Sequence, residues 1–461
     1  MPLAHLARII AAGSAAITVA AGIGPTSLSL ALTAAEATAA ETAPSETAPE
    51  TAAPEASTSS LVDSPKAVLD EAWQIVNRDY VDPNFNQTDW QAMRERLLGR
   101  DYASLETAYA ALKRALGTLD DPYTRFMDPQ QYAELTSQTS GEFSGIGLQL
   151  QVHPVTGQLT VLMPLEESPA REAGIQAGDR ILTIEGRSTE GMGVEGAARM
   201  IRGEAGTSVA LEIERGGLGS GQQFEVSVAR AILEVPAVTS ALRLEQDAQV
   251  GYVYLSEFSA HAAEQMHQAI ARLLDQGADA FVLDLRGNPG GLLQSSIDIS
   301  RMWLDEGIIV QTVDRNGVSE DTYANDTALT DLPLAVLVDE KSASSSEILT
   351  GALQDNDRAL VLGTKTFGKA LVQAVHELAD GSGLAVTVAN YYTPKGTDIS
   401  DRGITPSIEL ALTASQRRSL STNPDQWGTS ADPYYREAVT VLRPAILANG
   451  PQTELSRSLV D

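Results

Sequence analysis

Apolar residues form two largely continuous runs in the second half of the chain. The runs Ala280–Leu285 and Leu334–Val338 have the length of strands buried on both faces of a parallel sheet. A Gly-rich or Ser-rich turn follows each run, and apolar residues at helical spacing come next, over Leu292–Leu304 and Ile348–Asp357. Strands that alternate with helices predict an α/β core over residues 232–415. The pattern predicts further strands at Tyr252–Phe258, Leu360–Leu362, Leu371–Val375 and Leu384–Tyr391, and a further helix at Ala262–Leu274.

The part of the chain before this core has helical periodicity. Apolar residues recur every three or four positions over Val68–Val76, Trp90–Leu98 and Leu105–Leu116, and a glycine follows each of the last two segments. These segments predict an N-terminal helical domain, residues 61–140. Asp120–Asp121 stand before a proline, and adjacent acids there are more typical of a turn than of paired catalytic acids. Helical spacing at Tyr435–Leu447 predicts a helical extension over residues 416–461.

Residues 141–231 change character, with short β-like runs, many glycines and few aromatic residues. Gly145–Leu148 (GIGL) opens the stretch, and Gly178–Leu182 (GDRIL) precedes a helical segment at Gly193–Ile201. A glycine loop presents backbone N–H groups that can hold a peptide's terminal carboxylate, while an adjacent strand edge pairs with the peptide backbone. The same spacing also occurs in an ordinary tight turn.

The chain is acidic and contains no cysteine. It has 461 residues, a formal net charge of −29 and 43% hydrophobic residues, which allows several domains with an ample core. The negative charge argues against nucleic acid and anionic membrane surfaces as partners. The lack of cysteine excludes disulfides, thiolate catalysis and iron–sulfur clusters. The five histidines are scattered and form no zinc-protease motif, so no metal and no other cofactor is predicted.

The N-terminal residues have the composition of an export signal. Ile9–Ala35 contain no charged side chain and follow Arg8, and small residues around Ala31–Ala40 offer cleavage positions. We therefore expect a cleaved signal peptide, residues 1–35. An uncleaved membrane anchor is the alternative, because the run is long enough to span a bilayer. Residues 36–60 contain Ala, Thr, Glu, Pro and Ser without a large apolar residue, which predicts a disordered acidic linker.

The candidate chemistry lies in Ser342–Glu347 (SASSSE), between a predicted strand and a predicted helix. Backbone N–H groups are free at a helix start, and the helix dipole favours a developing negative charge there. A serine in such a turn is a nucleophile when a base takes its proton. Lys369 is a candidate base if burial lowers its pKa enough to leave the amine neutral near pH 7. The alternatives are a histidine base and a simple capping box, S-x-x-E, which only starts a helix.

The stretch from Lys341 to Gln373 resembles the active-site region of the carboxyl-terminal processing proteases, which are serine endopeptidases with a Ser/Lys dyad. The resemblance implies that Ser344 is the nucleophile, that Lys369 in the motif TFGK is the base, and that Gln373 supports the lysine. The chain departs from the family pattern after the nucleophile, where Ser345 replaces alanine, and after the lysine, where alanine replaces glycine.

Other roles and the fold follow from the same resemblance. The turn NPGG implies an oxyanion-hole N–H from Gly290 or Gly291, paired with the N–H of Ser345. The order of motifs in residues 141–231 resembles a circularly permuted PDZ domain of the protease-associated kind. It implies that the loop of Gly145, Ile146, Gly147 and Leu148 binds a substrate's carboxylate. The implied multi-domain α/β fold is a crotonase-like protease core with an inserted PDZ domain and an N-terminal helical region.

The family resemblance implies an exported serine endopeptidase of the periplasm or thylakoid lumen. Its partners would be proteins or peptides with free C-terminal tails, and peripheral membrane association stays open. Segments such as Asp120–Phe126 resemble members from oxygenic photosynthesisers. Members from cyanobacteria and plastids mature a photosystem II reaction-centre precursor. The alternative function is a catalytically silent PDZ scaffold or adaptor that retains the protease fold.

Overall fold

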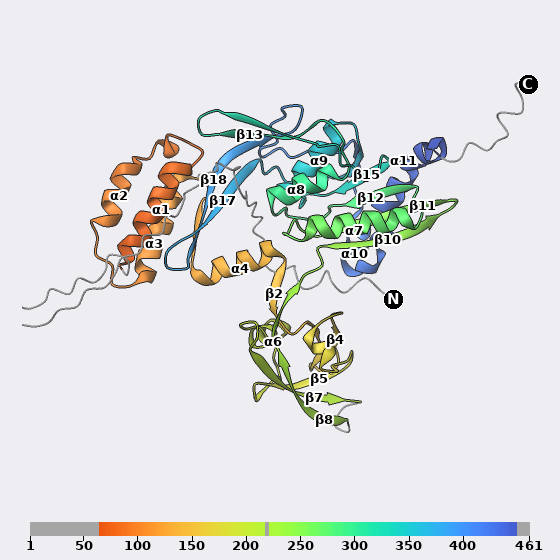
Figure 1. The fold of residues 1–461 in the computed structure, drawn as a ribbon, viewed down its shortest axis with the longest axis horizontal. Helices are drawn as coiled ribbons and strands as arrows, with labels where there is room; N and C mark the ends of the chain where they lie inside the picture. Colours follow the sequence, from red (N-terminus) through yellow and green to blue (C-terminus); the bar gives the residue numbers. More distant parts are fainter. Residues whose placement is uncertain (1–63, 217–220, 450–461) are drawn as a thin grey trace, which may run out of the picture.

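A computed structural model describes residues 64–216 and 221–449 of the chain (Figure 1). The predicted signal peptide, the predicted linker and residues 450–461 of the predicted C-terminal extension lie outside the described residues. Among the helices of the described part, none is both long and apolar enough to cross a membrane.

A six-stranded sheet forms the centre of the core, in the order β10-β11-β12-β15-β16-β19. The last five strands in this order run parallel to one another, and β10 pairs antiparallel with β11. The bounds are β10 Val238–Glu245, β11 Ala248–Leu255, β12 Ala280–Asp284, β15 Leu334–Val338, β16 Leu360–Gly363 and β19 Ile408–Glu409. The two apolar runs of the sequence are β12 and β15, and every residue of both strands is buried. The predicted α/β core is confirmed.

Helices cover both faces of this sheet, which explains why β12 and β15 are apolar along their whole length. Alternate side chains of each strand point to opposite faces, so each strand supplies residues to two buried clusters. One face packs against α7 (Ala262–Asp275), α8 (Leu293–Arg301) and α9 (Ser345–Asp355). The other face packs against α10 (Ala414–Thr422) and α11 (Pro433–Asn449).

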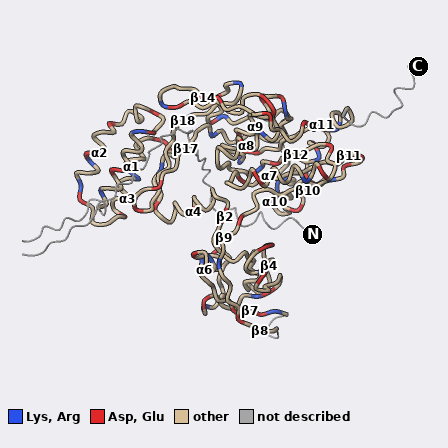
Figure 2. Tube along the Cα trace, in the orientation of Figure 1, with Lys and Arg blue, Asp and Glu red and all other residues tan. Residues whose placement is uncertain are grey.

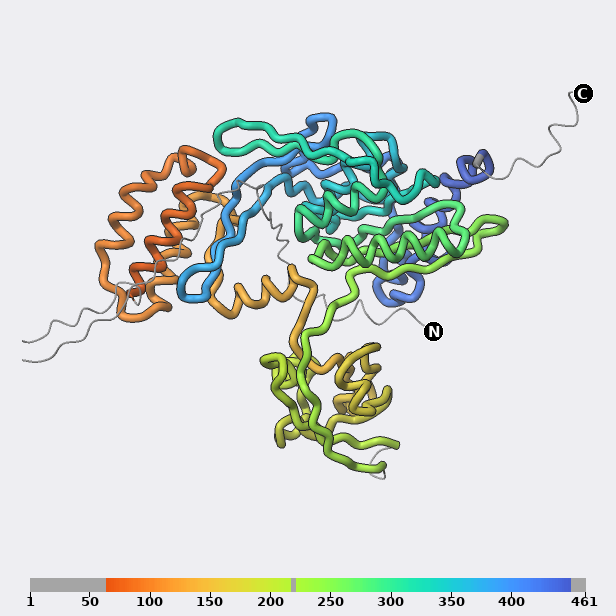
Figure 3. Tube along the Cα trace, viewed as in Figure 1, coloured from red at the N-terminus to blue at the C-terminus, as the bar shows by residue number. Residues whose placement is uncertain are grey.

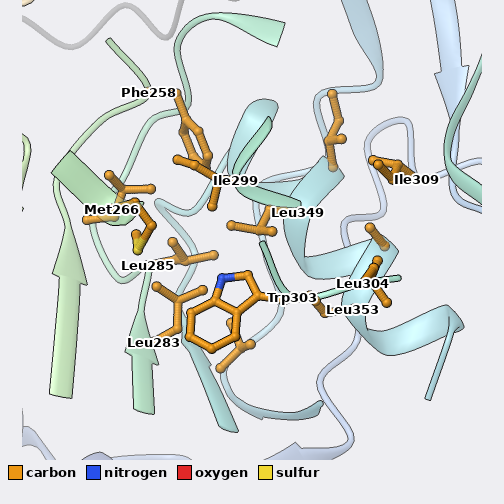
Figure 4. Packing of buried hydrophobic residues seen from close by; sticks show 14 of the residues in the cluster. Phe258, Met266, Leu283, Leu285, Ile299, Trp303, Leu304, Ile309, Leu349 and Leu353 are labelled. Carbon is orange, nitrogen blue, oxygen red and sulfur yellow. The ribbon is translucent and has the colours of Figure 1, made fainter. Parts of the chain in front are cut away.

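Trp303, which follows α8, lies within the core on the first face (Figure 4). Its indole meets the ring of Phe281 edge-on, with the ring centroids 5.3 Å apart. Leu349 and Leu353 of α9 lie close to the indole in the same cluster (Figure 4). This packing fixes α9 against the sheet, and with it the turn from which α9 starts.

A second sheet has the order β1-β18-β13-β14, with β17 paired to β18. The bounds are β1 Arg125–Met127, β13 Ile308–Asp314, β14 Ser319–Tyr323, β17 Leu371–Glu377 and β18 Gly383–Tyr392. The predicted N-terminal helices are α1 (Pro65–Asp79), α2 (Trp90–Leu98) and α3 (Leu105–Leu116), and they lie beside the β17–β18 hairpin (Figure 1). Leu378, Leu384 and Val386 of that hairpin share one buried cluster with these helices. The helical region is therefore joined to the α/β core through a common apolar interior.

Residues 141–234 form a separate lobe, which is joined to the rest by two paired strands, β2 and β9 (Figure 3). Helix α4 (Pro129–Ser140) leads into β2. The lobe has its own buried cluster and a sheet in the order β3-β4-β5-β7-β8, with β6 paired to β5. Its elements are β2 Glu142–Gly145, β3 Leu148–Val152, β4 Leu159–Pro164, α5 Pro169–Glu172, β5 Arg180–Ile184, β6 Arg187–Ser188, α6 Val194–Ile201, β7 Ser208–Arg215, β8 Gln222–Ala229 and β9 Ala231–Glu234.

Candidate active site

Ser344 lies in the turn that joins β15 to α9, where the sequence predicted a strand-to-helix turn. Its φ of 57° and ψ of −112° are rare for a residue with a side chain. Strained backbone of this kind is found most often at functional sites. The Oγ of Ser344 is buried and makes no hydrogen bond with any described residue. The hydroxyl of Ser344 is therefore not used to hold the turn together.

The other three serines of the cluster use their hydroxyl groups for structure. The Oγ of Ser342 donates to the carbonyl of Leu285 at 2.8 Å, which ties the turn to the end of β12. The Oγ of Ser345 donates to the carbonyl of Gly291 at 3.0 Å, and that of Ser346 to the carbonyl of Asn288 at 2.9 Å. Of the four hydroxyls, only that of Ser344 is uncommitted, which singles it out among its neighbours.

The carboxylate of Glu347 holds the backbone of both candidate catalytic residues. Its Oε2 accepts the N–H of Ser344 at 2.8 Å and the N–H of Lys369 at 2.9 Å. Its Oε1 accepts the hydroxyl of Thr366 at 2.6 Å and the N–H of Gly368 at 2.7 Å. Burial raises the pKa of Glu347 above its usual value, although these hydrogen bonds oppose the shift. Glu347 therefore does more than begin α9.

Tyr391 of β18 holds the carbonyl groups of the same two residues. Its hydroxyl is buried and lies 3.1 Å from the carbonyl oxygen of Ser344, and it also donates to the carbonyl oxygen of Lys369. Glu347 and Tyr391 thus clamp the peptide groups of Ser344 and Lys369 from the N–H side and from the C=O side. The two residues are 25 positions apart in the sequence, yet the fold fixes them to the same two side chains.

Lys369 is 1% exposed, and its amine lies 4.4 Å from the centroid of the Tyr123 ring. The pKa of Lys369 is lowered to about 7, first by burial and then by the charge of Arg125, while the charges of Asp121 and Glu347 oppose the shift. An amine with this pKa is about half neutral at pH 7. The pKa of Lys369 is therefore low enough for the amine to act as a base near neutral pH, as the sequence analysis required.

Gln373 of β17 is buried beside β18. Its amide nitrogen lies 3.5 Å from the Oγ1 of Thr387, and its amide oxygen has no hydrogen-bond partner among the described residues. A buried amide oxygen without a donor is costly, so such a group commonly serves a functional role. An amide also carries no charge that would stabilise an ammonium ion over a neutral amine.

The glycine turn Asn288–Gly291 packs directly against the Ser344 turn. A Cβ at Gly290 would lie 3.0 Å from the Cβ of Ser344 and 3.1 Å from the nitrogen of Ser345, so this close contact requires glycine. The N–H of Gly290 is already donated to the Oδ1 of Asn288 at 2.9 Å. Ser345 is the first residue of α9, where an N–H has no partner within the helix.

The loop Gly145–Leu148 lies in the separate lobe, between β2 and β3, and the structure does not bring it next to Ser344 (Figure 1). Gly147 has a φ of 77°, and a Cβ there would lie 2.3 Å from the Cβ of Ser168. Glycine is therefore required at this position by both the backbone and the packing. Within the described residues, no group of acidic and histidine side chains is placed to hold a metal ion.

Sequence reasoning assigned no catalytic role to the segment Asp120–Arg125, which the structure places beside Lys369. The predicted turn is present, because the Oδ1 of Asp121 accepts the N–H of Tyr123 at 2.9 Å. The other oxygen of Asp121, however, accepts the hydroxyl of Thr387 on β18 at 2.7 Å. Tyr123 and Arg125 then face the lysine. The proline turn was readable, but no local pattern indicates that it packs against a strand more than 260 residues away.

The fold and this site define a serine peptidase with an attached PDZ domain. The family profile "Peptidase family S41" matches residues 249–410, "PDZ domain" matches residues 161–215, and "Tricorn protease C1 domain" matches residues 63–98. The Carboxyl-terminal-processing protease of Synechocystis sp. is 46% identical over 351 residues, which are 76% of this chain and 82% of the relative. The chloroplastic Carboxyl-terminal-processing peptidase 3 of Arabidopsis thaliana is 38% identical over 363 residues, which are 76% and 69% of the two chains.

A solved structure, the photosystem II D1 C-terminal processing protease, aligns with a TM-score of 0.52 at 35% identity. The alignment covers 81% of this chain and 99% of that chain. The chain belongs to peptidase family S41 and is a serine endopeptidase of the carboxyl-terminal-processing kind. The predicted family and the predicted fold, an α/β protease core with a PDZ domain, are confirmed.

Glu347→Gln is expected to lower kcat for peptide cleavage by about 10- to 100-fold with little change in KM, the range typical of residues that orient catalytic groups. Both carboxylate oxygens of Glu347 accept hydrogen bonds, two each. A glutamine keeps only one of these acceptor oxygens, and its NH₂ group would face two hydrogen-bond donors. Steady-state kinetics on a peptide substrate provide the measurement, and urea unfolding checks the fold. Glu340→Gln is the matched control, because that glutamate is exposed near the same turn. Wild-type kinetics for Glu347→Gln would show that the hydrogen bonds from Ser344 and Lys369 to Glu347 are not needed for activity.

Proposed function

We propose that the chain is an exported protease that cleaves protein C-terminal tails with Ser344 as nucleophile and Lys369 as base. One observation carries the proposal. Ser344 has the only uncommitted hydroxyl in its cluster, and one carboxylate binds its N–H together with that of a buried lysine whose pKa is lowered to about 7. This combination supplies both a hydroxyl ready to react and an amine able to accept its proton.

In the proposed reaction, neutral Lys369 takes the proton of Ser344 as the Oγ attacks the carbonyl carbon of the scissile peptide bond. The lysine then returns the proton to the departing amine, which leaves an acyl-enzyme. Water, deprotonated by the same lysine, hydrolyses the ester and regenerates Ser344. The amide oxygen of Gln373, which has no hydrogen-bond partner among the described residues, is the group proposed to accept from the lysine amine during the reaction, and it adds no charge that would hold the ammonium form.

The tetrahedral intermediate carries an oxyanion, which we assign to the N–H groups of Ser345 and Gly291. Ser345 opens α9, where the helix dipole favours negative charge. Gly291 is joined to Ser345 by the hydrogen bond from the serine hydroxyl to the glycine carbonyl. The N–H of Gly290 is the weaker candidate of the two glycines, because it is donated to Asn288.

We further propose that residues 141–231 bind the end of the substrate while residues 232–415 cleave it, with residues 61–140 completing the site. The match to a PDZ domain supports tail binding, and the loop Gly145–Leu148 is the proposed carboxylate site. Because similar proteins include the photosystem II D1 C-terminal processing protease, the proposed substrate is a reaction-centre precursor with a C-terminal extension. Acidic and basic residues are interspersed over the described chain (Figure 2), which suits peptide substrates better than polyanions.

Export to the periplasm or thylakoid lumen is proposed from the signal-like residues 1–35. The chloroplastic and cyanobacterial origin of similar proteins is consistent with it. Retention of these residues as an anchor, and with it peripheral membrane association, is the alternative to cleavage. The linker proposed at residues 36–60 would tether the folded part to the membrane only if the anchor is retained.

Amidation of a substrate's C-terminus is expected to raise KM or Kd by about tenfold, because the N–H groups of the loop lose a charged acceptor. Matched acid and amide peptides, compared in both binding and cleavage, provide the measurement. An internal control is a peptide with the same scissile sequence and no tail motif. Equal kinetics for acid and amide would contradict carboxylate recognition by Gly145–Leu148. Binding of the acid peptide without any cleavage would instead favour a catalytically silent scaffold.

A further inference from the structure

The segment Asp121–Arg125 runs from the N-terminal helical region into the active site and is fastened to β18. The Oδ2 of Asp121 accepts the hydroxyl of Thr124 and the hydroxyl of Thr387, each at 2.7 Å. The hydroxyl of Thr124 accepts the backbone N–H of Thr387 at 3.0 Å. Thr387 is also the residue whose Oγ1 the amide nitrogen of Gln373 approaches. The segment is therefore held at a fixed place next to the catalytic strand.

Tyr123 stands in the middle of this segment, with its ring over the Lys369 amine. The distance from Nζ to the ring centroid is 4.4 Å, and the turn made by Asp121 fixes the backbone of Tyr123. Lys369 is fully buried, whereas Tyr123 is partly exposed, so one of the groups packed on the buried amine is a ring that itself reaches the surface. We propose that Tyr123 is a positioning residue of the catalytic base, whose ring covers the Lys369 amine and excludes water from it. This inference rests on the proposed function of Lys369.

The ring acts on the amine in two opposite ways. Its π face attracts a cation, which by itself favours the ammonium form. Its bulk removes water, which favours the neutral amine. Burial is the largest cause of the lowered pKa of Lys369, and the ring is among the groups that bury the amine, so we expect the loss of hydration to outweigh the attraction to the ring. Removing the ring should therefore return the amine toward the ammonium form at neutral pH.

Three charged groups act on Lys369: two flank Tyr123 in the same segment and one lies on α9, and a change confined to the Tyr123 side chain leaves all three in the chain. Arg125 of β1 lowers the pKa of the lysine, whereas Asp121 of the preceding loop and Glu347 of α9 raise it. Tyr391 of β18, which binds the lysine carbonyl, stays neutral because burial raises its pKa well above its usual value. A shift seen on removing the ring alone can therefore be attributed to the loss of cover.

The test is the pH dependence of single-turnover acylation in wild type, Tyr123→Ala and Tyr123→Phe. The wild-type rate should rise through one ionisation near pH 7. Tyr123→Ala should move that midpoint to higher pH by about one unit or more and reach a similar plateau above it, so the loss at pH 7 is about fivefold or more. Tyr123→Phe keeps the ring and should keep the midpoint. A purely structural defect would lower the plateau and leave the midpoint in place.

Two further variants make the outcome decisive. Tyr123→Leu retains apolar cover without a π face, so its midpoint should fall below that of wild type by about half a unit. It is also the variant to use if alanine at this position destabilises the fold. Tyr323→Ala removes an exposed tyrosine from β14 and is the control. If wild type shows the ionisation but the midpoints of Tyr123→Ala and Tyr123→Leu match it, the proposed role of Tyr123 is wrong. If wild type lacks the ionisation, Lys369 itself is not the base.

Discussion

Ser344→Ala is expected to abolish peptide cleavage and active-site labelling by a fluorophosphonate while leaving the fold intact. The loss should be on the order of 10⁴-fold or more, as for other serine nucleophiles. The Oγ of Ser344 makes no hydrogen bond with any described residue, so its removal leaves no buried partner unsatisfied. We therefore expect the free energy of unfolding to change by less than about 1 kcal/mol. Cleavage kinetics, mass spectrometry of the labelled peptide and urea unfolding test the three parts of this expectation.

The neighbouring serines provide the controls. Ser342→Ala and Ser346→Ala each remove a hydroxyl that donates to a backbone carbonyl, so they should disturb the turn and cost about tenfold in rate. They should also reduce stability more than Ser344→Ala, because each removes a buried hydrogen bond, although both carbonyls keep a backbone N–H donor. Full activity in Ser344→Ala combined with loss in Ser346→Ala would show that the nucleophile is assigned to the wrong serine.

The elements around the serine turn were predictable because near neighbours in the sequence determine them. The apolar run Leu334–Val338 coincides with β15, since a strand covered on both faces must be apolar at every position. Helix α9 starts at Ser345, three residues before the predicted start at Ile348, because the turn residues Ser345–Glu347 already have helical geometry. The short strand β1 and helix α4 were not predicted. A strand of three residues, Arg125–Met127, forms only because β18 is there to pair with it.

The parts of the site that escaped sequence reasoning depend on contacts between distant residues. The pattern from Ser344 to Glu347 predicted a helix cap, but two of the donors to Glu347 are the N–H groups of Gly368 and Lys369. Tyr391 was readable only as one apolar position of a strand, although its hydroxyl binds the backbone of Ser344, the proposed nucleophile. Residue types at one position do not indicate which loop the fold will bring beside them. The site is therefore predictable as a list of candidate residues, but its supporting contacts are not.

Lys369→Arg is expected to lower the acylation rate by about 10²- to 10⁴-fold although it keeps the positive charge. A guanidinium stays protonated at any accessible pH and so accepts no proton from Ser344. In wild type, burial holds the pKa of Lys369 at about 7, so the proton is lost as pH rises and acylation should increase through a single ionisation near that value. With the ordinary pKa of a lysine, about 10.4, only about four amines in ten thousand would be neutral at pH 7. Single-turnover acylation of wild type and Lys369→Arg across pH is the measurement.

Lys369→His separates the role of the base from the role of the charge. Imidazole loses its proton near neutral pH, so this variant should recover slight activity at pH 7 where the arginine variant has none. Its shorter side chain places the nitrogen away from the position of the lysine amine, which limits the recovery. Lys365→Arg is the matched control, because Lys365 is exposed four residues before the base in the same loop. If Lys369→Arg acylates at the wild-type rate while Ser344→Ala is inactive, the assignment of Ser344 as nucleophile holds, but another residue is the base. His376, 3.5 Å from Asp79, would then be among the next side chains to test.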